Sequence, residues 1–291
     1  IKYPIGSTEC ILVAFEAGNR HQDAHHAGRR ELTVAQRFAD MAFFRIKGDQ
    51  RVAAKSGQRH GMAVLERIQS EDFSRQMEAQ DLFLAGGTSP AALYRNESPV
   101  GGALKFSPVD SGLELDQVGG AYPIDIDSDG NTDLVLLRVG PDKVMRGLGQ
   151  CRFAEATDWN FDGLDLWSTA FAATWEKGAD WPTLAIGNYI DRAQEDMPWG
   201  SCTANWLHRA KDRGFAPPLP LTPSFCALSM LFTDWNRSGQ ASLRISNDRE
   251  YYRGGTEQLW HVSPGEPPRA YTPAEGWKPL KIWGMGIAST D

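Results

Sequence analysis

Carboxylates alternate along the stretch YPIDIDSDGNTDLVLLRVG, which runs from Tyr122 to Gly140. They form the pattern D-x-D-x-D-G-x-x-D, whose acidic residues are Asp125, Asp127, Asp129 and Asp133. Side chains at alternating positions of a tight loop can converge on one hard cation, and Gly130 permits the backbone turn. The backbone carbonyl of Asn131 adds another oxygen, so this ligand set suits Ca²⁺ better than Zn²⁺. We therefore predict a calcium loop at these five ligand positions.

The residues after the loop distinguish it from an EF-hand. An EF-hand has a bidentate Glu at its twelfth position, where this chain has Leu136, and continues as a helix. Here the loop is followed by DLVLLRV, which is short, apolar and rich in Val and Leu, and this favours a strand. We predict a calcium loop that leads into a strand from Leu134. A solvated acidic turn without metal is the alternative.

A second loop of the same spacing occurs downstream in LFTDWNRSGQASLRISND. Its ligand positions are occupied by Asp234, Asn236, Ser238, Gln240 and Ser242. One carboxylate among neutral groups predicts a weaker or vestigial calcium site. The stretch EKGAD, from Glu176 to Asp180, aligns with the loop but lacks its ligands, so we predict no metal there. The final residues KIWGMGIASTD resemble the approach to one more loop, with Asp291 as its first ligand.

Strand-like segments recur at a regular interval along residues 81–291. Each opens with a leucine that follows a small or acidic residue, and these are Leu82, Leu134, Leu184 and Leu243. Successive leucines are 52, 50 and 59 residues apart. This interval is too long for leucine-rich or ankyrin repeats, and it fits a propeller blade of four strands with generous loops. We predict that the four strands occupy equivalent positions in successive antiparallel blades.

Taken together, these segments resemble the FG-GAP/VCBS-repeat propellers, and within them the proteins like cartilage acidic protein 1 (ASPIC/UnbV-associated). The resemblance is carried by DIDSDGNTDLVLL, LAIGNYIDR, CALSMLFTDWNRSG, ISNDREYYRGGTEQLW and KIWGMGIASTD. It implies an all-β fold, a β-propeller of about seven four-stranded antiparallel blades, of which roughly four to five are covered here. It also implies calcium as the stabilising cofactor, an extracellular or periplasmic location, and no established catalysis.

The N-terminal residues do not match the blade pattern well. In DAHHAGRRELTVAQRFADMAFFRI, apolar residues recur at intervals of three and four, which predicts partly helical structure. We assign residues 1–60 to this N-terminal segment and residues 61–291 to propeller blades. We expect the blades to be incomplete at the C-terminus, because about seven blades at this interval need a longer chain.

Charge and hydropathy exclude some kinds of partner. The 291 residues carry a net charge of −7, and residues 81–291 contain 27 acidic against 18 basic side chains. Such a surface is a poor match for the phosphates of nucleic acids, which are bound by Lys and Arg. Mean hydropathy is −0.41, and no apolar run is long enough to cross a bilayer. We expect no nucleic-acid partner and no transmembrane segment.

The four cysteines include no C-x-x-C pair, so neither a zinc knuckle nor a thioredoxin-like site is indicated. Cys202 and Cys226 flank a proline-rich stretch that we interpret as an irregular insertion closed by a disulfide. The family resemblance supports both this pairing and an oxidising compartment. Nothing in the spacing decides whether Cys10 and Cys151 pair.

No GxSxG, HExxH, P-loop or GxGxxG motif occurs, and we assign no catalytic residue. The first hypothesis is a non-catalytic calcium-binding propeller that presents loops to a protein or glycan partner. A propeller enzyme of the lyase or glycoside hydrolase type is the alternative, because carboxylates that converge near an axis leave no sequence motif. The third is a subunit of a larger extracellular or peripheral membrane assembly.

Overall fold

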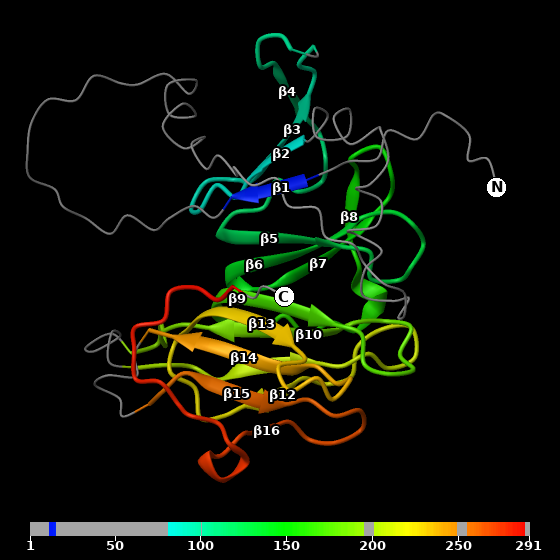
Figure 1. The fold of residues 1–291 in the computed structure, drawn as a ribbon. Coiled ribbons are helices and arrows are strands. Elements are labelled where there is room, and N and C mark those ends of the chain that lie inside the picture. The colour runs from blue at the N-terminus through cyan, green and yellow to red at the C-terminus, as the bar shows by residue number, and fades with distance from the viewer. Residues whose placement is uncertain (1–11, 16–80, 100, 195–200, 249–254, 289–291) are drawn as a thin grey trace, which may run out of the picture. The chain divides into compact units, whose positions relative to one another are not determined.

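The computed structural model describes residues 12–15, 81–99, 101–194, 201–248 and 255–288, and its regular structure is almost entirely β (Figure 1). The strands are β1 (Leu12–Phe15), β2 (Asp81–Leu84), β3 (Ala92–Asn96), β4 (Phe106–Val109), β5 (Val118–Ile124), β6 (Asp133–Pro141), β7 (Lys143–Gly147), β8 (Phe153–Glu155), β9 (Asp165–Thr174), β10 (Thr183–Asn188), β11 (Asn205–His208), β12 (Leu219–Leu221), β13 (Ala227–Thr233), β14 (Ser242–Asn247), β15 (Gln258–His261) and β16 (Arg269–Ala270). Short 3₁₀ turns lie at η2 (Thr157–Trp159) and η4 (Pro273–Glu275).

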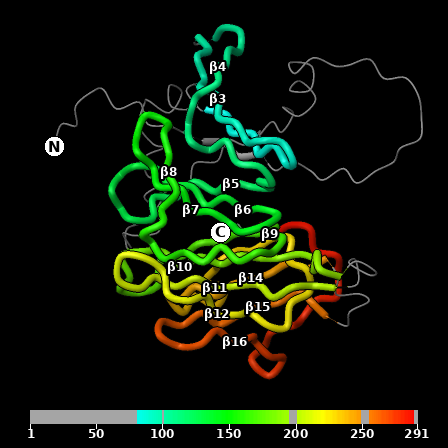
Figure 2. The backbone as a smooth tube through the Cα atoms, turned by 180° about the vertical axis from the view of Figure 1, so that it is seen from behind, coloured from blue at the N-terminus to red at the C-terminus, as the bar shows by residue number. Residues whose placement is uncertain are grey.

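Strands that follow one another in the sequence pair with one another in runs of four (Figures 1 and 2). We call β1–β4 the first run, β5–β8 the second, β9–β12 the third and β13–β16 the fourth. The pairs β5–β6–β7–β8 and β9–β10–β11–β12 are all antiparallel, as are β13–β14–β15–β16. Within the described residues the fold is therefore all-β, and its strands form open sheets rather than a closed ring.

The apolar sequence DLVLL in β6 reflects burial on both faces of the strand. Leu134 and Leu136 belong to a hydrophobic cluster shared with Phe83 of β2 in the first run. Val135 and Leu137 point the other way, into a cluster that contains Leu184 of β10 in the third run. Successive side chains of a strand point to opposite faces, so a strand covered on both sides reads as continuously apolar.

The third and fourth runs pack against each other in the same way. Ala185 of β10 lies in a cluster with Leu243 and Ile245 of β14, whereas Ile186 faces the second run. Each of the three clusters is thus shared by consecutive runs, and the core consists of layers between neighbouring four-stranded units. Burial of these apolar faces supplies the main driving force for the stacking.

The four leucines that set the sequence interval occupy corresponding strands. Leu82, Leu134, Leu184 and Leu243 lie in β2, β6, β10 and β14, which are the second strands of the four runs, and all are buried. The expectation of separate sheets is wrong for two of them, because β6 also pairs with β9 and joins the second and third runs into one eight-stranded sheet. The junction consists of Val139↔Trp167, Gly140↔Leu166 and Pro141↔Asp165. Its cause is strand length, since β6 extends beyond its pairing with β7 and meets the start of β9.

A second departure from the expected blades concerns the first run. Strand β1 pairs with β2 in parallel, Leu12↔Asp81 to Phe15↔Leu84, rather than antiparallel. Residues 16–80 separate the two strands, and a connection of that length allows a parallel crossover that a short hairpin turn forbids. The partly helical structure predicted for residues 1–60 concerns residues that, apart from β1, lie outside the described ranges, so it stays a prediction.

Candidate calcium site in the acidic loop

The acidic loop connects the first two strands of the second run. Eight residues lie between Ile124 at the end of β5 and Asp133 at the start of β6. Ser128 and Gly130 adopt left-handed backbone conformations, with φ of 60° and 88°. Gly adopts such a conformation without strain, which explains its place in the pattern. The loop folds back tightly enough to bring its first and last carboxylates together.

Backbone amides hold the carboxylates of the loop in place. The Gly130 N–H donates to Asp125 Oδ2 at 3.1 Å, and the Asp129 N–H donates to Asp127 Oδ1 at 3.3 Å. The Asn131 N–H donates to Asp129 Oδ1 at 2.7 Å. Each alternating side chain thus accepts a bond from an amide further along the loop, which orients it before any ligand binds.

Three of the predicted ligands converge. One oxygen from each of Asp125, Asp127 and Asp133 lies within 4.8 Å of the others. Asp129 is not part of this group; its Oδ2 accepts a bond from the Asn131 side-chain amide at 3.0 Å, which turns it toward Asn131. The four predicted carboxylates are therefore divided into a convergent triad and an exposed Asp129 that binds the Asn131 side chain. The Asn131 backbone carbonyl stays a predicted ligand.

Asp133 is the anchor of the triad, and none of its surface is exposed. Its Oδ2 accepts the Ile126 N–H at 2.8 Å, and its Oδ1 accepts the Gly147 N–H of β7 at 2.8 Å. Burial raises the pKa of Asp133 to about 7, and the nearby charges of Asp127 and Asp125 add to the effect against these two bonds. The Asp133 carboxyl thus connects the loop to β6 and β7, while its surroundings disfavour its charged form.

The residues present fit a bound cation. Asp125 Oδ1 is buried and has no hydrogen-bond partner within the described part of the chain. Burial also raises the pKa of Asp125, and the like charges of Asp129 and Asp127 raise it further. A divalent ion would supply the missing partner and offset the repulsion among these carboxylates. Because every donor is an oxygen, calcium suits the set better than zinc.

The second predicted loop repeats the geometry of the first. It also contains eight residues, between Thr233 of β13 and Ser242 of β14. Arg237 and Gly239 have φ of 57° and 80°, at the positions of Ser128 and Gly130. The sequence spacing therefore identified two loops with the same backbone conformation at its two left-handed positions.

The hydrogen bonds of the second loop also correspond to those of the first. The Gly239 N–H donates to Asp234 Oδ2 at 2.7 Å, as Gly130 does to Asp125. The Ser238 N–H lies 3.3 Å from Asn236 Oδ1, and the Gln240 N–H lies 3.3 Å from Ser238 Oγ. One carboxylate, that of Asp234, occupies this loop, so the electrostatic attraction for a cation is weaker than in the first.

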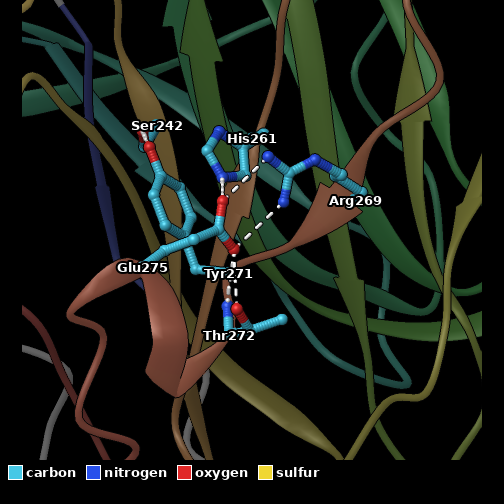
Figure 3. A network of polar contacts seen from close by, with 6 residues as sticks. All are labelled: Ser242, His261, Arg269, Tyr271, Thr272 and Glu275. Carbon is cyan, nitrogen blue, oxygen red and sulfur yellow. Dashed lines mark hydrogen bonds and ion pairs between the residues drawn. The ribbon is translucent and has the colours of Figure 1, made fainter.

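Ser242, which closes the second loop, belongs to a polar network (Figure 3). Its hydroxyl lies 3.0 Å from the Tyr271 hydroxyl, and the Tyr271 ring stacks on His261 with centroids 3.4 Å apart. Glu275 binds His261 Nε2 at 2.9 Å and also accepts bonds from Arg269 and Thr272. The bond from Arg269 and those from Thr272 hold the pKa of Glu275 well below its usual range. The closing position of this loop is therefore connected to β15 and β16 by side chains.

The loop of the third run is bound by a basic side chain from outside the loop, that of Arg209, which follows β11. Glu176 Oε1 accepts bonds from Arg209 Nε at 2.7 Å and from the Thr183 hydroxyl at 2.7 Å, with both charged side chains largely buried. Thr183 begins β10 as Asp133 begins β6. The guanidinium also donates to the Ser263 carbonyl at 2.6 Å and to the Glu266 carbonyl, both in the β15–β16 connection. A side-chain cation thus pairs with the carboxylate of this loop.

Sequence reasoning missed a set of basic residues that lie in the third strands or directly after them. The four leucines that set the sequence interval are called the marker leucines, and each pairs with a residue of the third strand of its run. The residue that follows this partner in the sequence is basic in every run: Arg95, Arg146, Arg209 and His261. Arg146 binds both oxygens of Asp158, at 3.0 and 2.9 Å, and lies over the Trp159 ring. The second-to-third strand connections differ in length, so no fixed spacing marks these residues.

The predicted cysteine pair is at bonding distance. The Sγ atoms of Cys202 and Cys226 are 2.04 Å apart. The stretch between them is not the irregular insertion we predicted, because it contains β11 and β12, the outer strands of the third run. Pro220 fits there because β12 is an edge strand and pairs with β11 alone. Cys10 and Asp291 lie outside the described residues, so the pairing of Cys10 stays open and the role of Asp291 stays a prediction.

Comparison with known proteins gives no family. A scan against protein-family models finds no match, and a search of curated proteins finds none either. The FG-GAP/VCBS-repeat resemblance therefore depends on the sequence motifs alone. No helix in the described part of the chain is long and apolar enough to span a membrane.

Proposed function

We propose that this chain is part of a calcium-stabilised β-propeller of the FG-GAP/VCBS-repeat type, similar to the cartilage acidic protein 1 group. We assign it a non-catalytic role, in which rigid loops bind a protein or glycan partner outside the cytoplasm. The observation that carries the proposal is the convergence of Asp125, Asp127 and Asp133 at the start of a buried strand.

The propeller part of the proposal is supported by repetition. Consecutive runs share hydrophobic clusters, as stacked blades would, and the marker leucines lie in corresponding strands. The loops before β6, β10 and β14 are all eight residues long. The three pairs that join β6 to β9 depart from separate blades, but they involve the ends of two long strands and leave the runs themselves intact.

The calcium part is supported by what the loop connects. Through Asp133 the loop reaches Gly147 on β7, and through Asp125 it reaches the end of β5. A cation held by these side chains would therefore fasten three strands of one run at a single point. Such a metal would make the loop end of these strands rigid and would perform no chemistry of its own.

Exposed aromatic side chains support the interaction role. Trp175 in the third-run loop and Trp235 in the fourth-run loop are 41% and 44% exposed. Tryptophan is enriched at binding hot spots, and two such residues in loops of equivalent position suit contact with a protein surface or a sugar ring. The bonded distance between Cys202 and Cys226 is compatible with the oxidising compartment that this role requires.

Removal of calcium is expected to destabilise the folded chain. A ligand that binds the folded loop alone stabilises by RT ln(1 + [L]/Kd), or about 2.7 kcal/mol at a hundredfold excess over Kd. Thermal unfolding followed with calcium and with a chelator should therefore give a clearly lower Tm in the chelator. Isothermal titration with calcium chloride measures the binding directly.

Asp127→Ala is the variant that tests the site. It removes a convergent carboxylate that bears no bond from another strand, so it should abolish most of the calcium-dependent shift in Tm. Asp234→Ala is the matched control in the second loop and should leave most of that shift. An unmoved melting curve together with the absence of bound calcium by metal analysis would reduce the acidic loop to a solvated turn.

A further inference from the structure

A buried carboxyl group outside the calcium loop lies where the second and third runs join. Asp142 follows β6 directly and is 4% exposed. Its Oδ1 accepts the Arg138 N–H at 2.7 Å, and its Oδ2 lies 2.7 Å from Ser168 Oγ on β9. The contact with Ser168 thus links the β6–β7 turn to the strand that pairs with the end of β6.

The hydrogen atoms available at Ser168 are too few for an ionised Asp142. Ser168 Oγ lies within bonding distance of two acceptors, Asp142 Oδ2 at 2.7 Å and Asn188 Oδ1 at 2.9 Å. The orientation of Asn188 is fixed because its Nδ2 donates to the Ala204 carbonyl at 2.8 Å. A hydroxyl has one proton to donate, so it cannot satisfy both oxygens. If Asp142 were ionised, whichever of the two oxygens lacked the Ser168 proton would face a lone pair of Ser168 Oγ in a buried site.

We propose that Asp142 is protonated in the folded protein and donates from Oδ2 to Ser168, which donates to Asn188, making this junction pH-sensitive. With this arrangement Asp142 Oδ1, Ser168 Oγ and Asn188 Oδ1 each accept one hydrogen bond. The chain of bonds runs from the β6–β7 turn through β9 to β10. An ionised Asp142 would accept the hydrogen bond of the Ser168 hydroxyl and leave Asn188 Oδ1 without a donor. That buried unsatisfied group would cost stability.

Within the described part of the chain, no basic side chain forms an ion pair with Asp142. The Arg138 guanidinium donates to Asp116 Oδ1 at 3.0 Å, to the Asp116 carbonyl at 3.1 Å and to the Pro141 carbonyl at 2.9 Å. On β9, Asp165 is exposed and pairs with Arg192. Burial raises the pKa of Asp142 to about 8, although hydrogen bonding with Ser168, the Arg138 N–H bond and the Arg138 charge oppose the shift.

The direction of the pH effect follows from proton binding. The unfolded chain releases the Asp142 proton near its ordinary pKa of 3.8, and the folded chain retains it up to about 8. Between these values the folded state binds more protons, so stability falls as pH rises and levels off above the folded pKa. Above it, the ionised carboxyl breaks the bond sequence through Ser168.

Asp142→Asn tests the proposal, because an amide can donate to Ser168 at any pH while its oxygen accepts the Arg138 N–H. The unfolding equilibrium constant is measured from about pH 5 to about pH 8 in excess calcium. In the wild type this group should raise it about tenfold per pH unit. Asp142→Asn should lack that component, whereas the exposed control Asp165→Asn should retain it. Equal pH slopes for wild type and Asp142→Asn would overturn the proposal.

A measurement on the wild type keeps the test decisive if Asp142→Asn folds poorly. Aspartate carboxyl carbons can be labelled with ¹³C and titrated by NMR with and without calcium. One carboxyl should titrate well above pH 6 with a midpoint that calcium does not move, which separates it from the carboxyls of the acidic loop. If every aspartate unaffected by calcium titrates near its ordinary pKa, Asp142 is ionised and the proposal fails.

Discussion

Arg209→Met is expected to lower the free energy of unfolding by about 3–5 kcal/mol, the usual effect of removing one partner of a buried ion pair. Methionine preserves much of the apolar stem but leaves the largely buried Glu176 carboxylate without its cation. The carbonyls of Ser263 and Glu266 also lose their donors, which weakens the contact between the third and fourth runs. Denaturant unfolding of both proteins measures the difference.

Two companion variants show whether the buried charge is the cause. Arg192→Met removes an exposed arginine from its pair with Asp165 and should lower stability by less than about 1 kcal/mol. The double variant Glu176→Met with Arg209→Met removes both charges and should recover most of the loss. The loss should be the same with and without calcium, because Arg209 supplies its own charge. Equal losses for Arg209→Met and Arg192→Met would contradict a special contribution from the buried Arg209–Glu176 ion pair.

Replacing Cys202 and Cys226 by serine is expected to lower the free energy of unfolding by roughly 3–4 kcal/mol, because the cross-link restricts the loop between them in the unfolded chain. That loop contains β11 and β12, so its release loosens the outer half of the third run. Denaturant unfolding under oxidising conditions measures the difference between the double variant and the wild type.

A peptide map provides the direct check of the bond itself. A non-reduced digest should contain the Cys202 and Cys226 peptides as one linked species, which reductant separates. The double serine variant should show no change at this position when reductant is added. Two free thiols at these positions in oxidised protein would remove both the disulfide and its support for an oxidising compartment.

The local features of this protein were predictable because they depend on short-range chemistry. The spacing from Asp125 to Asp133 determines a tight loop with left-handed turns, since each alternating side chain accepts an amide bond a few residues away. The same rule located the second loop at Asp234. The apolar run after Leu134 indicated a strand, and its lack of alternation reflects burial on both faces.

Pairing between distant segments was not predictable from local patterns. No local pattern indicates that β6 extends to meet β9, because three pairs at strand ends carry no hydrophobic period of their own. The proline content of the stretch between the two cysteines predicts an irregular loop, whereas the stretch forms β11 and the edge strand β12, in which proline is tolerated. Whether a strand lies at the edge or in the centre of a sheet depends on which strands are its neighbours in space.

Charged and polar side chains show most clearly which features are local in the sequence and which depend on the tertiary structure. By itself the sequence determined where carboxylates gather in the acidic loop, since those residues are neighbours along the chain. Tertiary structure alone placed Arg209 against Glu176, 33 residues away, and Ser168 between Asp142 and Asn188. Charge state and ion pairing depend on burial and on which groups meet across strands, and both arise only when the sheets have packed.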